Sequence, residues 1–406
     1  MLKLDLDSTP QLNIGIFTDS YRPYVSGVVR SIETFRHDLE RLGHRVFVFA
    51  PDYPEAKTED DVFRYLSLPA PTQPDFFFPI PLSFRHASTL KSIDLDIIHV
   101  HTPFIMGSLG AKMARRFNLP LVFTYHTLYQ SYSHYIPVGR SISNQLIKRW
   151  SRNFCNRCDL IIAPSLFVKR LIREMGVNKP VHVIPTGLNL EEYYGNDSEW
   201  LKTKYNIDSQ QKVILHVGRL AQEKNIGFIL EVIEELPLNC SVPFKLIIVG
   251  TGPEENELKQ LCRQKNIDSH VIFTGQVGHD ELLKCFAGGD IFVFASRTET
   301  QGIVLIEAKA SGLPAVALEA PYMEGILTDG KDGYLVKNKD AFINRLRFLL
   351  ENEDKRREMG EIGRDNTASF SAPYLAQKLA KSYHQAILEK KNKQSLEKTG
   401  AGSLSE

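Results

Sequence analysis

The segment 291–307 reads Ile291-Phe-Val-Phe-Ala-Ser-Arg-Thr-Glu299-Thr-Gln-Gly302-Ile-Val-Leu-Ile-Glu307. Its first four residues are all apolar, which is typical of a parallel strand that is covered on both faces. A polar loop with Glu299 follows, and the pattern then predicts a helix from Gly302 to Ser311, ended by Gly312-Leu-Pro314. A strand, a loop and a helix in this order form the repeating unit of a doubly wound α/β sheet.

The same unit repeats in two series, one on each side of a polar stretch at residues 191–211. The apolar runs of the first series lie at 13–17, 45–49, 97–100, 121–124, 160–163 and 181–184. Those of the second series lie at 213–217, 245–249, 271–274, 291–294, 315–318 and 334–336. We therefore predict an α/β protein with two facing doubly wound Rossmann-like domains, whose ligand edge is formed by the carboxyl ends of the strands.

The predicted boundaries follow from these series. The N-terminal domain covers 11–190, and the C-terminal domain covers 197–371. A helical pattern over 373–390 comes after the second series is complete, so we expect it to return to the first domain. The polar residues 391–406 are expected to form a disordered tail.

Composition excludes several classes of protein. No apolar run approaches the roughly 18–20 residues that cross a bilayer, and the N-terminus lacks the apolar core of a signal peptide, so we expect a cytoplasmic protein. The five cysteines are sparse and odd in number, which argues against a disulfide framework. Cys155-Asn-Arg-Cys158 lacks the second pair of ligands that a structural zinc site requires.

The net charge is only +1, but it is unevenly distributed. Residues 97–158 contain no Asp or Glu, whereas residues 191–370 contain 21 Lys and Arg against 29 Asp and Glu. This asymmetry favours contact between the first half and an anionic surface. A solvated basic face is the alternative.

The loop and helix after Phe294 suit a nucleoside-diphosphate sugar. A helix N-terminus offers free N–H groups and a partial positive charge to a phosphate. Glu299 and Glu307 can accept hydrogen bonds from hydroxyls on either side of that phosphate, and Thr300, Gln301 and Gly302 line the turn between them. The alternatives are a helix cap for Glu299 and a solvated or paired carboxylate for Glu307.

Two further turns follow predicted strands. Gly218-Arg219-Leu-Ala-Gln-Glu-Lys224 places two cations where they can neutralise a diphosphate, although they could be ordinary surface residues. Val249-Gly250-Thr-Gly252 is a short glycine turn that matches neither the dinucleotide fingerprint nor the Walker motif.

Together these motifs resemble glycosyltransferase family 4, the retaining enzymes with two facing Rossmann-like domains of the GT-B fold. The resemblance covers about residues 11–390. Four segments are similar in sequence to the diacylglycerol 3-α-glucosyltransferase branch. They are Thr298-Glu-Thr-Gln-Gly302, Tyr125-His-Thr-Leu-Tyr129, Ser133-His-Tyr135 and Phe17-Thr-Asp19 to Gly27.

The resemblance implies a role for each matching residue. Arg219 and Lys224 hold the diphosphate, beside the turn with Gly250 and Gly252. Glu299 contacts the hexose, Glu307 binds the ribose hydroxyls, and Gly27 lets a first-domain loop approach the phosphate. His126 lies near the transferred sugar and Asp19 on the acceptor side, although His126 could also be a satisfied buried histidine. The donor is expected to be a UDP-sugar, and no cofactor or metal is expected.

Asp94-Leu-Asp96 has the spacing of a metal-binding Asp-x-Asp motif. It directly precedes the predicted strand 97–100, at the amino end and away from the ligand edge. We therefore predict metal-independent transfer.

Two segments of the first domain suggest a membrane. Phe76, Phe77 and Phe78 stand in a predicted loop that could dip into a membrane interface. Ile142, Leu146, Trp150 and Phe154 recur every four residues, as in an apolar helical stripe. The cations among them are Lys148, Arg149 and Arg152, and a basic amphipathic helix is typical of an anionic membrane surface. A core-facing helix is the alternative.

The predicted function is transfer of glucose from UDP-glucose to the 3-hydroxyl of 1,2-diacylglycerol, giving α-glucosyl diacylglycerol at the inner face of the cell membrane. The predicted partners are thus a nucleotide sugar, a lipid acceptor and an anionic membrane surface. One alternative is the same transfer to a cell-wall, exopolysaccharide or phosphoinositol acceptor. Another is a protein that binds a nucleotide sugar without catalysis. No aromatic-basic motif for nucleic acid is visible.

Overall fold

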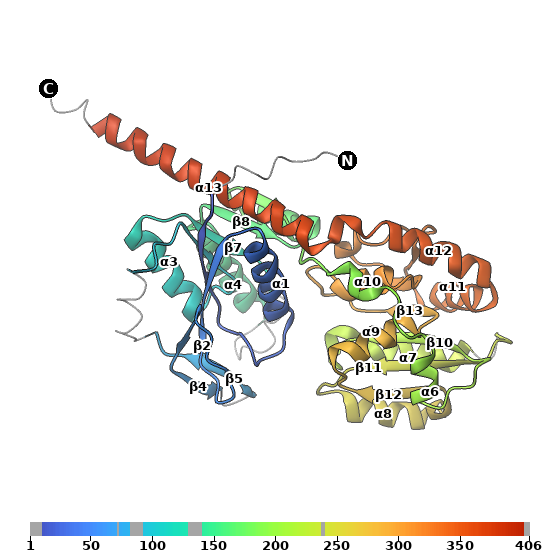
Figure 1. Cartoon of the computed structure of the whole chain (residues 1–406). Coiled ribbons are helices and arrows are strands. Elements are labelled where there is room, and N and C mark those ends of the chain that lie inside the picture. The colour runs from blue at the N-terminus through green and yellow to red at the C-terminus, as the bar shows by residue number, and fades with distance from the viewer. Residues whose placement is uncertain (1–9, 71–72, 82–91, 129–139, 237–239, 402–406) are drawn as a thin grey trace. The chain divides into compact units, whose positions relative to one another are not determined.

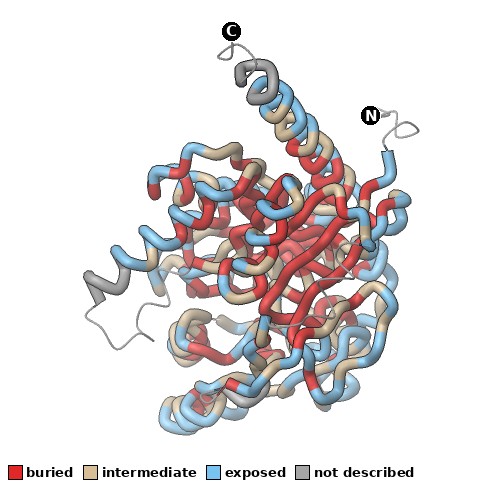
Figure 2. The backbone as a smooth tube through the Cα atoms, turned by 90° about the vertical axis from the view of Figure 1, so that its left-hand side faces the viewer, coloured by how far each residue is buried: buried red, intermediate tan, exposed pale blue. Residues whose placement is uncertain are grey.

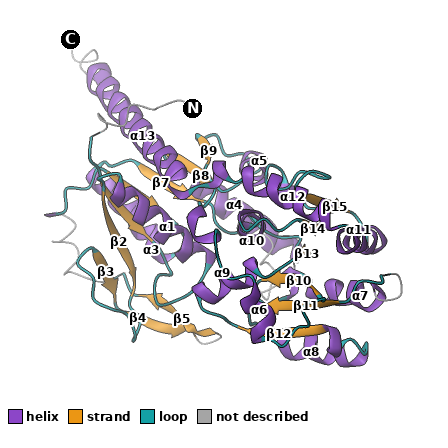
Figure 3. Cartoon of the chain, turned by 45° about the vertical axis from the view of Figure 1, so that its right-hand side comes forward, coloured by secondary structure: helices purple, strands orange, loops and turns teal. Residues whose placement is uncertain are grey.

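The computed structural model describes residues 10–70, 73–81, 92–128, 140–236 and 240–401 (Figure 1). They divide into two compact units. The first unit contains the described residues up to Gly187 and from Ala372 onward, and the second contains Leu188–Ser371. Each unit is built on one parallel sheet with helices beside it (Figure 3), which confirms the predicted doubly wound α/β fold.

The first unit has a seven-stranded sheet in the order β3-β2-β1-β6-β7-β8-β9. Its strands are β1 (Asn13–Phe17), β2 (Arg45–Pro51), β3 (Val62–Tyr65), β6 (Ile97–Val100), β7 (Leu121–Thr124), β8 (Leu160–Ala163) and β9 (Val181–Val183). Its helices are α1 (Gly27–Arg41), α3 (Ile105–Phe117), α4 (Arg140–Cys155), α5 (Leu166–Glu174) and α13 (Ala372–Ala401). Every residue of β6, β7 and β8 is buried. Figure 2 accordingly shows mostly red, buried backbone where the strands run through the inside of the molecule.

Helix α13 is the returning helix that the sequence predicted. Leu375, Leu379 and Tyr383 are buried in the same apolar cluster as Ile32 and Phe35 of α1. Their spacing of three or four residues places each set on one helical face. The C-terminal segment of the chain therefore completes the core of the first unit.

Two segments differ from the sequence prediction. Residues 391–401 continue α13 as a helix, where a disordered tail was predicted. This stretch contains three Lys and one each of Gln, Leu, Glu and Ala, which favour the helix, and it extends a helix that tertiary packing has already nucleated. Phe76–Phe78 lie in strand β5 (Gln73–Pro79), which pairs antiparallel with β4 (Ser67–Ala70), where a loop was predicted.

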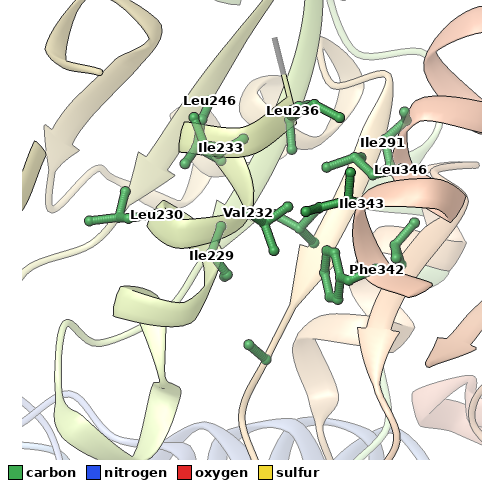
Figure 4. Close-up of a cluster of buried hydrophobic side chains, with 14 of the residues drawn as sticks. Ile229, Leu230, Val232, Ile233, Leu236, Leu246, Ile291, Phe342, Ile343 and Leu346 are labelled. Carbon is green, nitrogen blue, oxygen red and sulfur yellow. The ribbon is translucent and has the colours of Figure 1, made fainter. Parts of the chain in front are cut away.

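The second unit has a six-stranded parallel sheet in the order β12-β11-β10-β13-β14-β15. Its strands are β10 (Lys212–Val217), β11 (Phe244–Val249), β12 (Val271–Gly275), β13 (Ile291–Phe294), β14 (Ala315–Leu318) and β15 (Gly333–Val336). Its helices are α6 (Glu199–Lys204), α7 (Ile226–Glu235), α8 (Glu255–Gln264), α9 (His279–Ala287), α10 (Ile303–Ala310), α11 (Lys339–Glu351) and α12 (Glu353–Asp365). Figure 4 shows part of its core, where Val232 of α7 and Ile343 of α11 lie side by side.

Candidate active site

The three predicted donor motifs meet within the second unit. They follow strands β11, β10 and β13, which are direct neighbours in the sheet. Because the carboxyl ends of parallel strands share one edge, the turns at Gly250, Arg219 and Glu299 converge. Motifs that lie up to 80 residues apart in the sequence thus form one site.

Glu299 and Lys224 form an ion pair at this edge. The Lys224 ammonium donates to Oε1 of Glu299, and the Ser296 hydroxyl donates to the same oxygen at 3.0 Å. The two charged side chains are 20% and 19% exposed, so the pair is partly shielded from water. Helix α10 begins after Gly302 with no side-chain cap, so the alternative that Glu299 caps this helix is wrong.

Arg219 remains available for a ligand. Its side chain is exposed, and it makes no ion pair with any residue in the described ranges. It stands on the turn directly after β10. A free guanidinium beside a paired lysine is suited to a diphosphate, which accepts several hydrogen bonds from such groups.

Gly250 and Gly252 are required by the close approach of two turns. A Cβ atom on Gly252 would lie 2.2 Å from the Leu220 carbonyl oxygen, and one on Gly250 would lie 2.0 Å from that of Gly218. Gly250 also has φ +132°, a conformation that other residues rarely adopt. These glycines therefore position the backbone that carries Arg219, whether or not they touch a ligand themselves.

The entrance of α10 has the geometry of an anion site. Gly302 has φ 67° and precedes the first helical residue, so the chain turns sharply from Thr300 and Gln301 into the helix. The first N–H groups of a helix have no partner within it. The predicted phosphate contact at Thr300, Gln301 and Gly302 is compatible with this turn and stays a prediction.

The Glu307 carboxylate is paired with another side chain and is not solvated, which were the two alternatives to ribose binding. It is only 2% exposed, and the Tyr193 hydroxyl donates to its Oε1 at 2.8 Å. Tyr193 comes from the short helix η2 (Leu190–Tyr193) and is itself buried. Tyr193 therefore orients the carboxylate to which the sequence assigns the ribose.

In the first unit, His126 follows β7 and belongs to a row of three histidines. Nε2 of His126 lies 2.8 Å from Nδ1 of His101, and the rings of His101 and His99 are 4.2 Å apart. His99 in turn contacts the Tyr383 hydroxyl of α13 at 2.6 Å and the Thr124 hydroxyl at 2.7 Å. The predicted site histidine is therefore held by His101, which follows β6, and His101 in turn lies against His99 within β6.

All three rings are neutral near pH 7. Burial lowers the pKa of His99 and of His126 to about 3. Burial, together with the neighbouring rings, lowers the pKa of His101 well below its usual value. A neutral imidazole has one N–H donor and one acceptor nitrogen, so the row exchanges hydrogen bonds without carrying charge.

Asp19 is buried beside the first turn of α3. Its Oδ2 accepts a 2.5 Å hydrogen bond from the Thr102 hydroxyl, and its Oδ1 accepts one of 2.9 Å from the Met106 amide. Burial raises the pKa of Asp19 to about 6, against the lowering effect of these hydrogen bonds. Both oxygens are thus engaged within the first unit, and the acceptor-side role stays a prediction.

Gly27 begins α1, and Ser26 caps this helix by accepting a hydrogen bond from the Val29 amide at 3.3 Å. A Cβ atom on Gly27 would meet no atom within 4 Å. A side chain at this position would therefore meet no described neighbour, and the predicted phosphate approach at Gly27 stays a prediction.

The Asp94-Leu-Asp96 segment has a structural role at the amino end of β6. Asp96 Oδ2 accepts a 2.8 Å hydrogen bond from the Asn13 amide, and the Asp94 carbonyl accepts one of 2.8 Å from the Asn13 side chain. These contacts join the beginnings of β1 and β6, opposite the edge that carries His126.

The apolar stripe predicted along α4 does not form one face. Phe154 is buried in the core, whereas Leu146 is 58% and Trp150 38% exposed. A four-residue step advances about 40° around a helix, so residues several steps apart drift onto different faces. The side chain of Ile142 lies outside the described residues. Lys148, Arg149 and Arg152 are exposed, and their role at a membrane stays a prediction.

The aromatic residues of β5 divide between packing and exposure. Phe76 packs against Tyr24 with ring centroids 5.7 Å apart, and Phe77 packs against Tyr53 at 5.0 Å. Phe78 is 48% exposed, and its cross-strand partner Leu68 is 59% exposed. Within the described ranges, no helix combines the length and apolar character needed to cross a membrane.

Several site residues were missed by sequence reasoning. They are Tyr193, Ser296, His99, His101 and Thr102. His99 and His101 stand in and directly after the predicted strand 97–100, so their position at a ligand edge could have been recognised. Ser296 likewise follows the predicted strand 291–294, whereas Tyr193 gave no such signal, because its role depends on a contact across the fold.

Two family models match the chain. The model described as "Glycosyltransferase Family 4" matches residues 25–192, and the one described as "Glycosyl transferases group 1" matches residues 197–366. Each match falls almost entirely within one structural unit. The donor motifs at Arg219, Glu299 and Glu307 lie in the second match.

Curated relatives and solved structures agree with these models. The chain is 34% identical over 331 residues to the alpha-monoglucosyldiacylglycerol synthase of Streptococcus pneumoniae, covering 80% of this chain and 75% of the relative. It is 29% identical over 399 residues to the synthase of that name from Acholeplasma laidlawii, covering 94% and 99%. The structure of HepE from Anabaena with UDP and glucose superposes with a TM-score of 0.75 at 20% identity, covering 92% of this chain and 100% of that one.

Proposed function

This chain belongs to glycosyltransferase family 4, and on that premise we propose that it transfers glucose from UDP-glucose to the 3-hydroxyl of 1,2-diacylglycerol. The product would be α-glucosyl diacylglycerol, formed with retention of the donor's anomeric configuration. The likeness to two alpha-monoglucosyldiacylglycerol synthases is the observation that carries this acceptor. The donor site supports the chemistry independently of the acceptor.

In the proposed reaction, the second unit stabilises the departing diphosphate. Arg219 and Lys224 supply positive charge, and the entrance of α10 supplies N–H groups. Glu299 is oriented by Lys224 and Ser296, so that its remaining acceptor capacity can hold a hexose hydroxyl. We propose that these groups suffice without a metal ion, and we assign no protein nucleophile.

Surface features of the first unit support a role at an anionic membrane. A pocket of about 500 Å³ lies at the amino ends of β7 and β8. The cations that line it are Lys112, Arg115, Arg157 and Lys390. Lys390 contacts Asp159 at 3.2 Å, whereas the other three make no ion pair with a described residue. Unpaired cations around a hollow favour an anionic ligand.

An apolar hollow adjoins this basic pocket. It has a volume of about 630 Å³ and shares Ser108 and Lys112 with the basic pocket. Phe104 and Trp150 line it, with ring centroids 5.3 Å apart, and both are more than a third exposed. Apolar side chains beside cations match the interface of an anionic bilayer, so we propose peripheral attachment through this face.

An assay of the purified protein tests the proposed reaction. Labelled UDP-glucose, UDP-galactose and GDP-mannose are supplied with diacylglycerol dispersed in anionic lipid, and the product is analysed for anomeric configuration. We expect an α-glucosyl lipid from UDP-glucose, at a rate that EDTA leaves unchanged. Transfer to diacylglycerol from none of the donors would contradict the proposal, and loss of activity restored by magnesium would contradict metal independence.

Liposome sedimentation tests the membrane face. We expect binding to rise with the content of anionic lipid and to fall in a triple variant with Lys112, Arg115 and Arg157 changed to Gln. The matched control changes Arg263, Lys331 and Lys337 to Gln in the second unit, which removes the same charge from other exposed positions. Equal loss of binding in both variants would indicate a net-charge effect and contradict this face.

A further inference from the structure

The contact between His101 and His126 has room for only one hydrogen. Nδ1 of His101 and Nε2 of His126 are 2.8 Å apart, which is a hydrogen-bond distance. Both rings are neutral, so each has one protonated nitrogen. Either His101 donates from Nδ1 to His126, or His126 donates from Nε2 to His101.

The other nitrogen of His101 decides between these arrangements. His101 is 1% exposed, and its Nε2 is buried with no hydrogen-bond partner among the described residues. If His101 donates from Nδ1, its Nε2 is a bare acceptor. If His126 donates instead, Nε2 of His101 carries a buried N–H that has no acceptor. Orphaned buried N–H groups are rarer in proteins than acceptors that lack a donor.

We propose that His101 is a positioning residue that donates to Nε2 of His126 and thereby fixes His126 as the tautomer protonated at Nδ1. His126 then presents an N–H group on the ring edge away from His101. Among the described residues, none accepts a hydrogen bond from this Nδ1, which leaves it for a ligand. The geometry makes His126 a neutral hydrogen-bond donor.

This inference rests on the proposed function for its chemical consequence. An N–H donor at the sugar can hold a hexose hydroxyl or an oxygen of the departing diphosphate. It cannot accept the proton of the attacking acceptor hydroxyl while His101 occupies its other nitrogen. His126 therefore stabilises an oxygen of the donor and does not act as the base.

His99 provides a matched control within the same row. Both of its ring nitrogens contact hydroxyl groups, those of Tyr383 and Thr124. A hydroxyl both donates and accepts, so His99 is satisfied in either tautomer. Its ring lies against His101 but has no hydrogen bond to His126 among the described contacts.

The tautomer is measured by nitrogen NMR on the full chain labelled with ¹⁵N-histidine, without donor or acceptor. Protonated and bare ring nitrogens have well-separated shifts, and the signals of His126 are assigned by their loss in His126→Asn. We expect Nδ1 of His126 to be protonated and Nε2 bare. A protonated Nε2 would overturn the proposal.

Variants connect the tautomer to turnover. In His101→Asn the amide nitrogen can replace the Nδ1–H donor, whereas His101→Leu has no donor. We expect His101→Asn to keep the Nδ1–H signal of His126, and His101→Leu to lose it and lower kcat about tenfold. His99→Gln should leave the His126 signal unchanged. If His101→Leu does not fold, the His126 signals of the wild type and of His101→Asn still show which ring nitrogen of His126 is protonated.

The outcomes are separable from those of the proposed function. The spectra need no substrate, so the Nδ1–H tautomer together with absent glucosyl transfer would contradict only the proposed function. An active enzyme whose His126 is protonated at Nε2 would contradict only the role of His101. Retention of the Nδ1–H signal in a folded His101→Leu variant would also overturn that role.

Discussion

The hydroxyl of Tyr193 donates a 2.8 Å hydrogen bond to Oε1 of Glu307, 114 positions further along the chain. Tyr193 is 4% and Glu307 2% exposed, so the bond lies inside the second unit. A buried carboxylate requires strong donors in place of water. The bond therefore fixes the orientation of the side chain to which the ribose hydroxyls are assigned.

Tyr193→Phe removes this donor and preserves the ring. We expect the second unit to lose about 1–3 kcal/mol of stability, because a buried charged acceptor loses a partner. UDP affinity should also fall, since the carboxylate is no longer oriented. Thermal unfolding and UDP titration calorimetry measure the two effects. Glu307→Gln is the companion variant, and unchanged UDP affinity in both would contradict the ribose assignment.

Lys224→Met tests the ion pair with Glu299. We expect the midpoint of thermal unfolding to fall, because Glu299 keeps only the Ser296 hydroxyl as a donor in the described contacts. The dissociation constant for UDP should rise about ten- to a hundredfold, as for the loss of a charge-assisted hydrogen bond.

The double variant Lys224→Met, Glu299→Gln separates these two effects. It should recover the unfolding midpoint, since no unpaired carboxylate remains, but it should not recover UDP affinity. Recovery of both would mean that Lys224 acts only through Glu299. In parallel, Glu299→Ala should remove most glucosyl transfer, and normal turnover in that variant would contradict its role at the hexose.

Gly252→Ala tests the close approach of the two turns. The added Cβ would lie 2.2 Å from the Leu220 carbonyl oxygen, so one turn must move. We expect a loss of about 1–3 kcal/mol in stability and weaker UDP binding, because the same backbone carries Arg219. Gly227→Ala is the control, since its Cβ would lie 3.9 Å from Leu261 in ordinary contact. Equal behaviour of the two variants would disprove the packing argument.

The histidine row predicts a pH dependence of stability. The pKa of His99 is lowered to about 3 by burial, against about 6.5 in the unfolded chain. Below pH 6.5 the unfolded state therefore binds a proton that the folded state does not, and stability falls as pH falls toward 3. Between pH 7.5 and 5 this one residue costs about 2 kcal/mol.

His99→Gln measures that contribution. The variant loses the hydrogen bonds of the ring and should be less stable than the wild type at pH 7.5. The difference should shrink toward pH 5, because only the wild type loses the contribution of His99 as pH falls. Denaturant unfolding at several pH values provides the measurement. A difference that stays constant or grows on acidification would contradict a neutral buried His99.

Local pattern was sufficient for most of the fold. Continuous apolar runs such as Ile291–Phe294 must be buried on both faces, and their alternation with helical periods leaves few topologies other than a doubly wound sheet. Strand β3 was missed because Val62-Phe-Arg-Tyr65 is a short edge strand with a charged residue and lacks a continuous apolar run. Residues 76–78 were predicted to lie in a loop, but they belong to β5, where Phe76 packs on Tyr24 and Phe77 on Tyr53.

The sequence by itself determined the two α/β series, the returning C-terminal helix and the residue types at the donor edge, because strand burial, helical period and helix-terminus chemistry are local properties. Only the tertiary structure decided that Lys224 pairs with Glu299, that Tyr193 orients Glu307, and that His101 meets His126. Each of these contacts joins side chains that lie at least 25 positions apart. A hydrogen bond forms only when the distance between donor and acceptor lies within a range of a few tenths of an ångström. The packing within each unit sets that distance, and the order of residues does not reveal it.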